Sequence, residues 1–278
     1  MYVEHLLLAT KILQSLHFLT PPKMASFPST LARSSLTGTR TAIFGGSAGM
    51  GKATAAAVLA LGGRVTLISR TQSKLDAAAA ELGGGDNIEV AAIDAMNTEA
   101  VAKFFADVEP GYFSHIVVTL GPAVHGADDI FGEATLDKVQ QQFSKFNVAW
   151  TVSKYGAPKV ADGGSLTFFS GTLSRAISKG SSCLGPVNAA VECLAKCLAK
   201  DLGPRLRVNC VSPTLTRTSA VTGGMTAEQA EGMFVGFGKT IPAGRSGEAM
   251  DLGHAVAFLI TNNFMTGHVL DVDGGKTL

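Results

Sequence analysis

The sequence predicts a single α/β domain built on a doubly wound parallel sheet of about seven strands with helices on both faces. Short apolar segments alternate with longer helix-forming segments through most of the chain, and a glycine-rich turn joins the first strand to the first helix. A chain of 278 residues that is 46% hydrophobic and 16% charged can bury the core of such a domain. We therefore expect one domain over residues 39–278.

The first strand, turn and helix indicate a ligand site. Residues 41–44 form an apolar run, a glycine-rich turn follows, and residues 52–60 are strong helix formers. Glycine lets the backbone turn tightly and approach a phosphate, and the helix N-terminus offers it free N–H groups. This Rossmann-type unit predicts a site for a dinucleotide pyrophosphate. The turn supplies the candidate cofactor-binding residues Gly45, Ser47, Gly49, Met50 and Gly51.

The end of the second strand indicates which dinucleotide is bound. Residues 64–68 form the strand, and Ser69 and Arg70 follow where a residue that reads the ribose is expected. An acid there would bond the 2′-hydroxyl of NAD, whereas a hydroxyl and a guanidinium suit the 2′-phosphate of NADP. We therefore expect NADP(H), bound by Ser69 and Arg70 with help from Ser47. The alternative is that Arg70 is a solvated residue before a helix.

The remaining elements follow the same alternation. We expect helices over residues 73–82, 99–108, 136–154 and 186–201, and strands over residues 88–94, 115–119, 165–169, 206–211 and 268–272. Alternating strands and helices form right-handed crossovers and a parallel sheet. The loops that follow residues 44, 69, 94, 119, 169 and 211 should therefore converge at the carboxyl end of the sheet, where such folds bind ligands.

Charge and hydropathy limit the classes of partner. The net charge is +1 with acids and bases interspersed, which gives no electrostatic reason to expect nucleic acid or an anionic membrane as a partner. The sequence contains no run of eighteen apolar residues, the length that a membrane-spanning helix needs. The four cysteines, at positions 183, 193, 197 and 210, lack the spacing of a zinc site or a disulfide framework, so we expect no metal and interpret them as buried small hydrophobes in a reducing compartment. The expected partners are a small molecule and copies of the chain.

Residues 1–38 differ from the rest of the chain. They combine leucine-rich and serine-rich stretches with basic residues and the single acid Glu4. This composition fits an organelle transit segment. A flexible extension, with initiation at Met24, fits it as well. We expect a cytoplasmic protein unless the segment directs it to an organelle.

From about residue 39 to its end the chain resembles the short-chain dehydrogenases/reductases. The resemblance is carried by the glycine turn, by residues 207–213 followed by Thr218, and by residues 266–267 with 272–275. It implies the fold, a nicotinamide cofactor and roles for single residues. In these roles Asp94 binds the adenine, Gly121 lets the backbone pass close to the cofactor, Asn147 is the asparagine of the central helix, and Pro213 and Thr218 belong to the segment that reads the nicotinamide carboxamide.

The catalytic residues that the resemblance implies are missing. The family has a serine after the fifth strand and a Tyr-x-x-x-Lys motif that opens the next helix, where this chain aligns Leu184 and Asn188. A shift of one residue offers Cys183 and Val187 instead. A literal Tyr-x-x-x-Lys occurs at residues 155–159, but it precedes the fifth strand and contains a proline, so we interpret it as a helix end.

Four side chains remain as candidates for the catalytic site. Ser170 follows the fifth strand and could bond a substrate carbonyl or imine. Arg175 either orients an acidic substrate group or pairs with a neighbouring loop, and Asn188 could hold the nicotinamide ribose in place of the lysine. Asn147 completes the set. His125 near the expected mouth is either a proton donor or an incidental loop histidine.

These residues predict an atypical NADP(H)-dependent oxidoreductase that transfers a hydride to a hydrophobic carbonyl, imine or iminium. A carbonyl needs a proton donor other than the usual tyrosine, whereas an iminium carbon accepts hydride without an acid. Apolar residues between positions 218 and 241, in an expected lid, indicate a hydrophobic substrate. Two alternatives stay open: a non-redox cyclase or isomerase of secondary metabolism, on a looser resemblance to fungal alkaloid-pathway reductases, and an inactive NADP-binding sensor or scaffold.

The resemblance also implies a homodimer or homotetramer. Family members pair through the central helix and the following one, which here carry apolar and small residues. Packing of the core explains the same residues. They are Phe143, Val148, Ala149, Trp150, Ala190, Leu194 and Leu198.

Overall fold

The computed structural model describes residues 35–121 and 135–278. A single seven-stranded parallel sheet in the order β3-β2-β1-β4-β5-β6-β9 runs through the unit that begins at Ser35. Its strands are β1 (Arg40–Phe44), β2 (Arg64–Ser69), β3 (Ile88–Ala92), β4 (Phe113–Val118), β5 (Val160–Phe169), β6 (Arg207–Pro213) and β9 (Val269–Val272). This is the predicted α/β architecture with the predicted number of strands.

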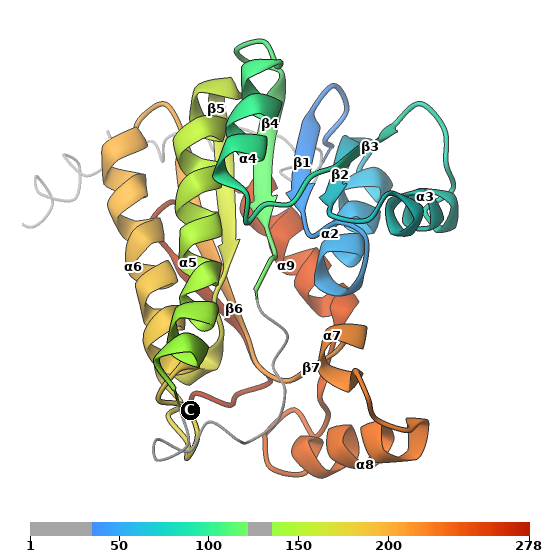
Figure 1. The fold of residues 1–278 in the computed structure, drawn as a ribbon, viewed down its shortest axis with the longest axis vertical. Coiled ribbons are helices and arrows are strands. Elements are labelled where there is room, and N and C mark those ends of the chain that lie inside the picture. The colour runs from blue at the N-terminus through green and yellow to red at the C-terminus, as the bar shows by residue number, and fades with distance from the viewer. Residues whose placement is uncertain (1–34, 122–134) are drawn as a thin grey trace, which may run out of the picture. The chain divides into compact units, whose positions relative to one another are not determined.

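Helices cover both faces of the sheet (Figure 1). One face carries α4 (Thr98–Ala106), α5 (Leu136–Gly156) and α6 (Leu184–Leu202), whose apolar residues form one core cluster with the sheet. The other face carries α2 (Gly49–Ala60), α3 (Gln72–Glu81) and α9 (Ala249–Thr261), which form the second cluster. Fully buried apolar residues such as Ile43 and Phe44 alternate between the two clusters, because successive side chains of a strand point to opposite faces.

The register of the central strands brings their carboxyl ends together. Phe44 at the end of β1 pairs with Ile68 of β2 on one side and with Val118 of β4 on the other. The turns after these three strands therefore leave the sheet at the same level. This placement is what a site between the turns requires.

Most of the expected elements agree with the structure to within a few residues, with two differences. Strand β5 begins at Val160, five residues before the expected start at residue 165. Helix α9 was not expected, although it packs closely on α2, where a β carbon on Gly253 would lie 2.6 Å from the carbonyl oxygen of Ala53. The buried guanidinium of Arg207 holds the end of α9 by donating to the carbonyl oxygens of Leu259 and Ile260, at 2.8 Å each.

The expected lid between positions 218 and 241 consists of two helices, α7 (Ser219–Thr222) and α8 (Ala227–Gly238). A capping box formed by Thr226 and Gln229 begins α8. Phe234 of α8 is buried, and the guanidinium of Arg217 lies 4.6 Å from the centre of its ring. Arg217 belongs to β7 (Thr216–Arg217), which pairs with β8 (Gly247–Glu248) in a small second sheet.

The expected pairing face of α5 and α6 is partly inside the core. Val148, Ala149 and Leu194 are buried in the cluster on that side of the sheet, so core packing accounts for them. Trp150 is exposed. The expectation of buried cysteines is correct for Cys183 and Cys210 and wrong for Cys193 and Cys197, which lie on the exposed face of α6.

No helix within the described residues is long and apolar enough to cross a membrane. The same part of the chain contains no group of three or more histidine, cysteine or acidic side chains arranged to hold a metal ion. Of the expected extension over residues 1–38, residues 1–34 lie outside the described part of the chain.

Candidate functional site

A cavity of about 660 Å³ opens at the carboxyl ends of β1, β2, β3 and β4. Its wall includes the turn before α2, the segments after β2, β3 and β4, one face of α5 and the start of α7. Most of the sequence-predicted cofactor residues line it: Gly45, Ser47, Gly49, Met50, Gly51, Ser69, Arg70, Asp94, Gly121 and Thr218. The structure thus brings together residues that lie far apart in the sequence.

The glycine turn has the backbone that its sequence indicates. Gly45 has φ +90° and Gly49 has φ +52°, values that a residue with a side chain rarely adopts. Gly51 is buried, and a β carbon there would overlap the carbonyl oxygen of Gly45 and lie 2.9 Å from the hydroxyl of Thr119. The turn is therefore tightly closed, and the start of α2, whose first N–H groups have no partner within the helix, borders the cavity.

Thr119 supports this turn from the end of β4. Its hydroxyl donates to the carbonyl oxygen of Phe44 at 3.0 Å, and its backbone N–H donates to the same oxygen at 3.0 Å. In the structure it ties the turn after β4 to the turn after β1.

One corner of the cavity suits an anionic group. Ser69 and Arg70 line it at the end of β2, and Lys74 of α3, which the sequence analysis had not singled out, lies beside them. The hydroxyl oxygen of Ser69 is buried without a hydrogen-bond partner in the described part of the chain. A buried hydroxyl with no protein partner next to two cationic side chains fits the oxygens of a phosphate.

Asp94 lines the cavity after β3, the strand next to β2, and its carboxylate accepts a hydrogen bond from the backbone N–H of Met96 at 3.0 Å. Thr218 lines the cavity beside the glycine turn, with its methyl carbon 3.2 Å from where a β carbon on Gly49 would stand. Asn147 is exposed and also lines the cavity. Pro213 is buried at the end of β6 and is absent from the described wall.

Lys145 of α5 is a second lysine of the cavity wall that the sequence analysis had not singled out. Its ammonium donates to the carbonyl oxygen of Ser170 at 2.7 Å and to the carboxamide oxygen of Asn188 at 2.8 Å. Burial lowers the pKa of Lys145 to about 8. A signal was present in the sequence, because Lys145 lies three and four residues before Val148 and Ala149, on the face of the expected helix that turns inward.

Ser170 and Arg175 belong to a network behind the cavity. The hydroxyls of Ser170 and Ser174 donate to one oxygen of the buried Glu192 at 2.8 and 2.7 Å, and Arg175 donates to its other oxygen at 2.6 Å. Arg175 also pairs with Asp271. Of the two roles that the sequence left open for Arg175, the structure shows the pairing with neighbouring segments. The described wall of the cavity contains Lys145 and none of these network side chains.

The start of α6 shows where the residues aligned with the family's motif lie. Leu184 is the first residue of the helix, and Asn188 is buried one turn later. The literal Tyr-x-x-x-Lys at residues 155–159 lies elsewhere: Tyr155 is in the last turn of α5, and Lys159 donates to the carbonyl oxygen of Val108. His125 lies outside the described residues.

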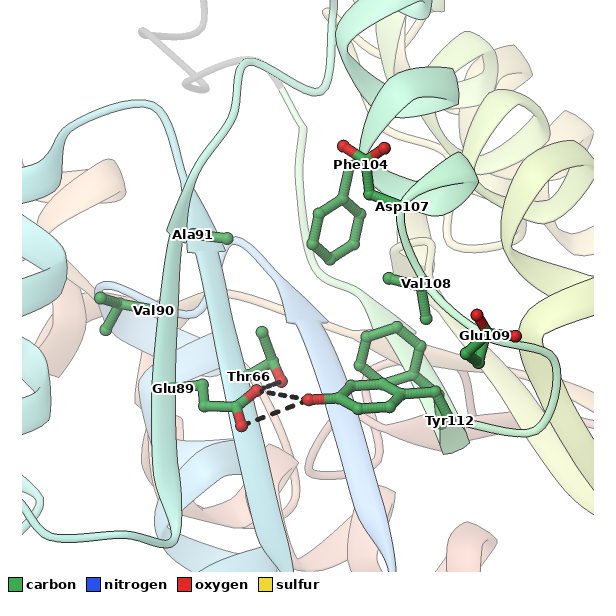
Figure 2. A pocket seen from close by; sticks show the side chains of 10 residues that line it. Thr66, Glu89, Val90, Ala91, Phe104, Asp107, Val108, Glu109 and Tyr112 are labelled. Atoms are coloured by element: carbon green, nitrogen blue, oxygen red, sulfur yellow. Dashed lines mark hydrogen bonds between the residues drawn. The ribbon is translucent and has the colours of Figure 1, made fainter.

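A second cavity, of about 460 Å³, lies between β2, β3, α4 and the start of β4. Figure 2 shows the hydroxyl of Tyr112 pointing at Glu89, to which it donates at 3.0 Å. Arg40 pairs with Glu89 and lies 4.5 Å from the centre of the Tyr112 ring. Burial raises the pKa of Glu89, but the hydrogen bonds from Arg40 and Tyr112 outweigh it, so that its pKa is below the usual value. These polar groups satisfy one another.

Comparisons with known proteins agree with this geometry. The profile of the family described as enoyl-(acyl carrier protein) reductase matches residues 45–277. The 3-oxoacyl-(acyl-carrier-protein) reductase of Mus musculus is 30% identical over 241 residues, which cover 85% of this chain and 97% of that protein.

Solved structures give the same result. A small-chain dehydrogenase crystallised with NADPH is 30% identical, with a TM-score of 0.67 over 86% of this chain and 98% of its own. A dehydrogenase/reductase from Sinorhizobium meliloti 1021 is 26% identical, with a TM-score of 0.78 over 91% of this chain and 100% of its own.

Proposed function

The chain belongs to the short-chain dehydrogenase/reductase superfamily, and we propose that it reduces a hydrophobic carbonyl, imine or iminium with NADPH. The phosphate-binding corner of the cavity is the observation that carries this proposal. Arg70 and Lys74 are two cations within one wall, and the buried hydroxyl of Ser69 has no partner among the described residues. A 2′-phosphate would supply acceptors for all three, whereas the diol of NAD would leave the cations unpaired.

The rest of the cavity suits the remainder of the cofactor. The N-terminus of α2 after the closed glycine turn would hold the pyrophosphate, and Asp94 in the cavity wall would accept a hydrogen bond from the adenine amine. When bound, the nicotinamide supplies the hydride. A related structure that holds NADPH supports the same cofactor for this chain.

We further propose that reduction here proceeds without the tyrosine and lysine typical of the family. Leu184 and Asn188 occupy the start of α6, and neither side chain can deliver a proton at neutral pH. The proton for a carbonyl oxygen must then come from another group. An iminium substrate would need none.

A hydrophobic substrate fits the apolar side chains of the cavity wall, which include Met50 and Leu120. The expected lid also carries exposed apolar side chains, Met225 between α7 and α8 and Val235 on α8. The name of the mouse relative makes a 3-oxoacyl thioester the first carbonyl to test.

Trp150 is exposed on α5, which leaves room for pairing with a second copy.

The test combines binding and turnover. The purified protein is titrated with NADPH and NADH by fluorescence, and NADPH absorbance is then followed with 3-oxoacyl thioesters, ketones, quinones and cyclic imines. Tight NADPH binding with oxidation by one acceptor class supports a reductase of that class. NADPH binding without oxidation by any acceptor favours the cyclase or the sensor, and absence of binding contradicts the proposal.

A further inference from the structure

We propose that Lys145 is the proton donor for carbonyl reduction, held at the cavity wall by the carbonyl oxygen of Ser170 and the carboxamide of Asn188. The inference rests on the proposed NADPH-dependent reduction. When the acceptor is a carbonyl, the reaction requires an acid, and the start of α6 offers none. Lys145 would supply that acid.

The geometry leaves one N–H group of the Lys145 ammonium available to donate to a ligand. An ammonium carries three N–H groups. Two of them are directed to Ser170, at 2.7 Å, and to Asn188, at 2.8 Å. Since Lys145 forms part of the cavity wall, the third can point into the cavity. Both acceptors are fixed, because Ser170 is buried directly after the central strand β5 and Asn188 is buried in the first turns of α6.

The position along the cavity is also the right one. Gly121, at the turn after β4, faces the stem of Lys145, where a β carbon would lie 3.4 Å from the lysine Cδ. The ammonium therefore stands beyond the turns after β1 and β4, at the level of the end of β5. The phosphate-binding corner with Arg70 is at the end of β2, on the other side of β1 in the sheet. A dinucleotide extended along the strand ends would reach from that corner toward Lys145.

The charges around Lys145 allow it to lose a proton. Glu192 of α6 and Cys210 of β6 face it, and Glu192 stabilises its charged form, but burial outweighs this effect and lowers the pKa to about 8. The carboxylate of Glu192 is committed to Ser170, Ser174 and Arg175. Burial raises the pKa of the Cys210 thiol to about 12, so it is neutral. Across the cavity, the ionised side chains of the wall are Arg70, Lys74 and Asp94 among the described residues.

The proton transfer balances with the proposed reaction. The carbonyl carbon receives the hydride, the electron pair of the C=O bond moves to oxygen, and the oxygen takes a proton from the Lys145 ammonium. The products are an alcohol, the oxidised nicotinamide and a neutral lysine amine, which water reprotonates. An acid whose pKa lies near the working pH is suited to this step.

The test uses two acceptors that differ in their need for a proton. The first is the best ketone or 3-oxoacyl thioester of the panel, and the second is a preformed N-alkylated cyclic iminium, whose reduction neutralises the carbon without an acid. For Lys145→Met we expect carbonyl reduction to fall by about 10²–10⁴-fold, whereas NADPH binding and iminium reduction remain at wild-type levels. Lys145→Arg should behave in the same way, because a guanidinium does not release its proton.

Lys154→Met is the matched control. It removes a lysine from the exposed face of the same helix, and both acceptors should be reduced at wild-type rates. In the wild-type protein, the rate of carbonyl reduction should be highest below pH 8 and decline above it. The rate of iminium reduction should show no such decline. Independently of activity, reductive methylation of Lys145, followed by mass spectrometry against pH, should rise with a midpoint near 8.

The outcomes separate the two proposals. If the wild type oxidises NADPH with either acceptor but Lys145→Met reduces the carbonyl at the wild-type rate, Lys145 is not the donor and the proposed function stands. Equal losses with the carbonyl and the iminium, or loss of NADPH binding, would show that Lys145 has only a positioning role. A wild type that binds NADPH and reduces neither acceptor overturns the proposed function and the donor with it.

Discussion

Arg175 Nη1 lies 2.6 Å from Glu192 Oε2 and joins the loop after β5 to helix α6 behind the cavity. The Glu192 side chain is 9% exposed, and the hydroxyls of Ser170 and Ser174 donate to its other oxygen. A buried carboxylate requires such partners, because an unpaired charge in the interior is costly. The pair therefore fixes the backbone of Ser170, to which Lys145 donates.

We expect Arg175→Met to lower the free energy of unfolding by about 2 kcal/mol, less than the 3–5 kcal/mol of a fully buried pair because Arg175 is 36% exposed. Urea unfolding measures it. Lys103→Met is the control, since Lys103 pairs with Asp107 at the surface, where a pair contributes about 0.3–0.5 kcal/mol. The double variant Arg175→Met/Glu192→Gln should lose less than the sum of the single losses. Additive losses would mean that the two side chains do not interact.

The stability of the fold should depend on pH through His115. Its Nδ1 lies 2.9 Å from the hydroxyl of Ser165, and burial together with the charge of Arg207 lowers its pKa from 6.5 to about 4. The folded state therefore prefers the neutral ring, so the contribution of His115 is complete above pH 6.5 and is lost as the pH falls toward 4. Between pH 8 and pH 5 the loss from this residue is about 2 kcal/mol.

The measurement is urea unfolding at both pH values for the wild type and for His115→Gln. Glutamine can bond the Ser165 hydroxyl and does not titrate, so the difference between the two pH values should be smaller by about 2 kcal/mol in the variant. The same pH dependence in both proteins would rule out His115 as its source.

The glycine turn should not tolerate a side chain at Gly51. A β carbon there would overlap the carbonyl oxygen of Gly45, so the turn must open and its amides must move. We expect Gly51→Ala to weaken NADPH binding by at least about tenfold, which corresponds to 1.4 kcal/mol, measured by fluorescence titration. Gly236→Ala is the control, because nothing lies within 4 Å of a β carbon at that position of α8. Wild-type affinity in Gly51→Ala would place the ligand elsewhere.

Arg70 should decide between the two dinucleotides. A charge-assisted hydrogen bond contributes about 1.5–3 kcal/mol, so Arg70→Ala should lose roughly 10- to 150-fold in NADPH affinity and leave NADH affinity unchanged. Arg64→Ala removes an exposed arginine from the opposite end of the same strand and should change neither. Parallel losses of NADPH and NADH in Arg70→Ala would indicate a role outside the 2′-phosphate.

The local pattern of residues was sufficient to predict the sheet, the glycine turn and most of the cavity wall. Strand and helix periodicity report which face of an element is buried, and Gly45 and Gly51 report a backbone that other residues cannot adopt. Parallel strands end at one edge, so Ser69 and Asp94 could be assigned to the same site from their positions alone. Helix α9 was not predicted, because its apolar run follows the lid without a clear boundary signal. Its packing on α2 is a tertiary contact.

The partners of the polar side chains were decided by the tertiary structure. Lys145 and Asn188 are 43 residues apart, and no spacing rule links positions on two different helices. The sequence left Arg175 either to orient a substrate group or to pair with a neighbouring loop, and the fold directs its guanidinium, like the Ser170 hydroxyl, toward Glu192. A buried charge must find its partners wherever the fold brings them. Lys145 therefore became part of the cavity wall only because the fold places α5 and α6 next to the end of β5.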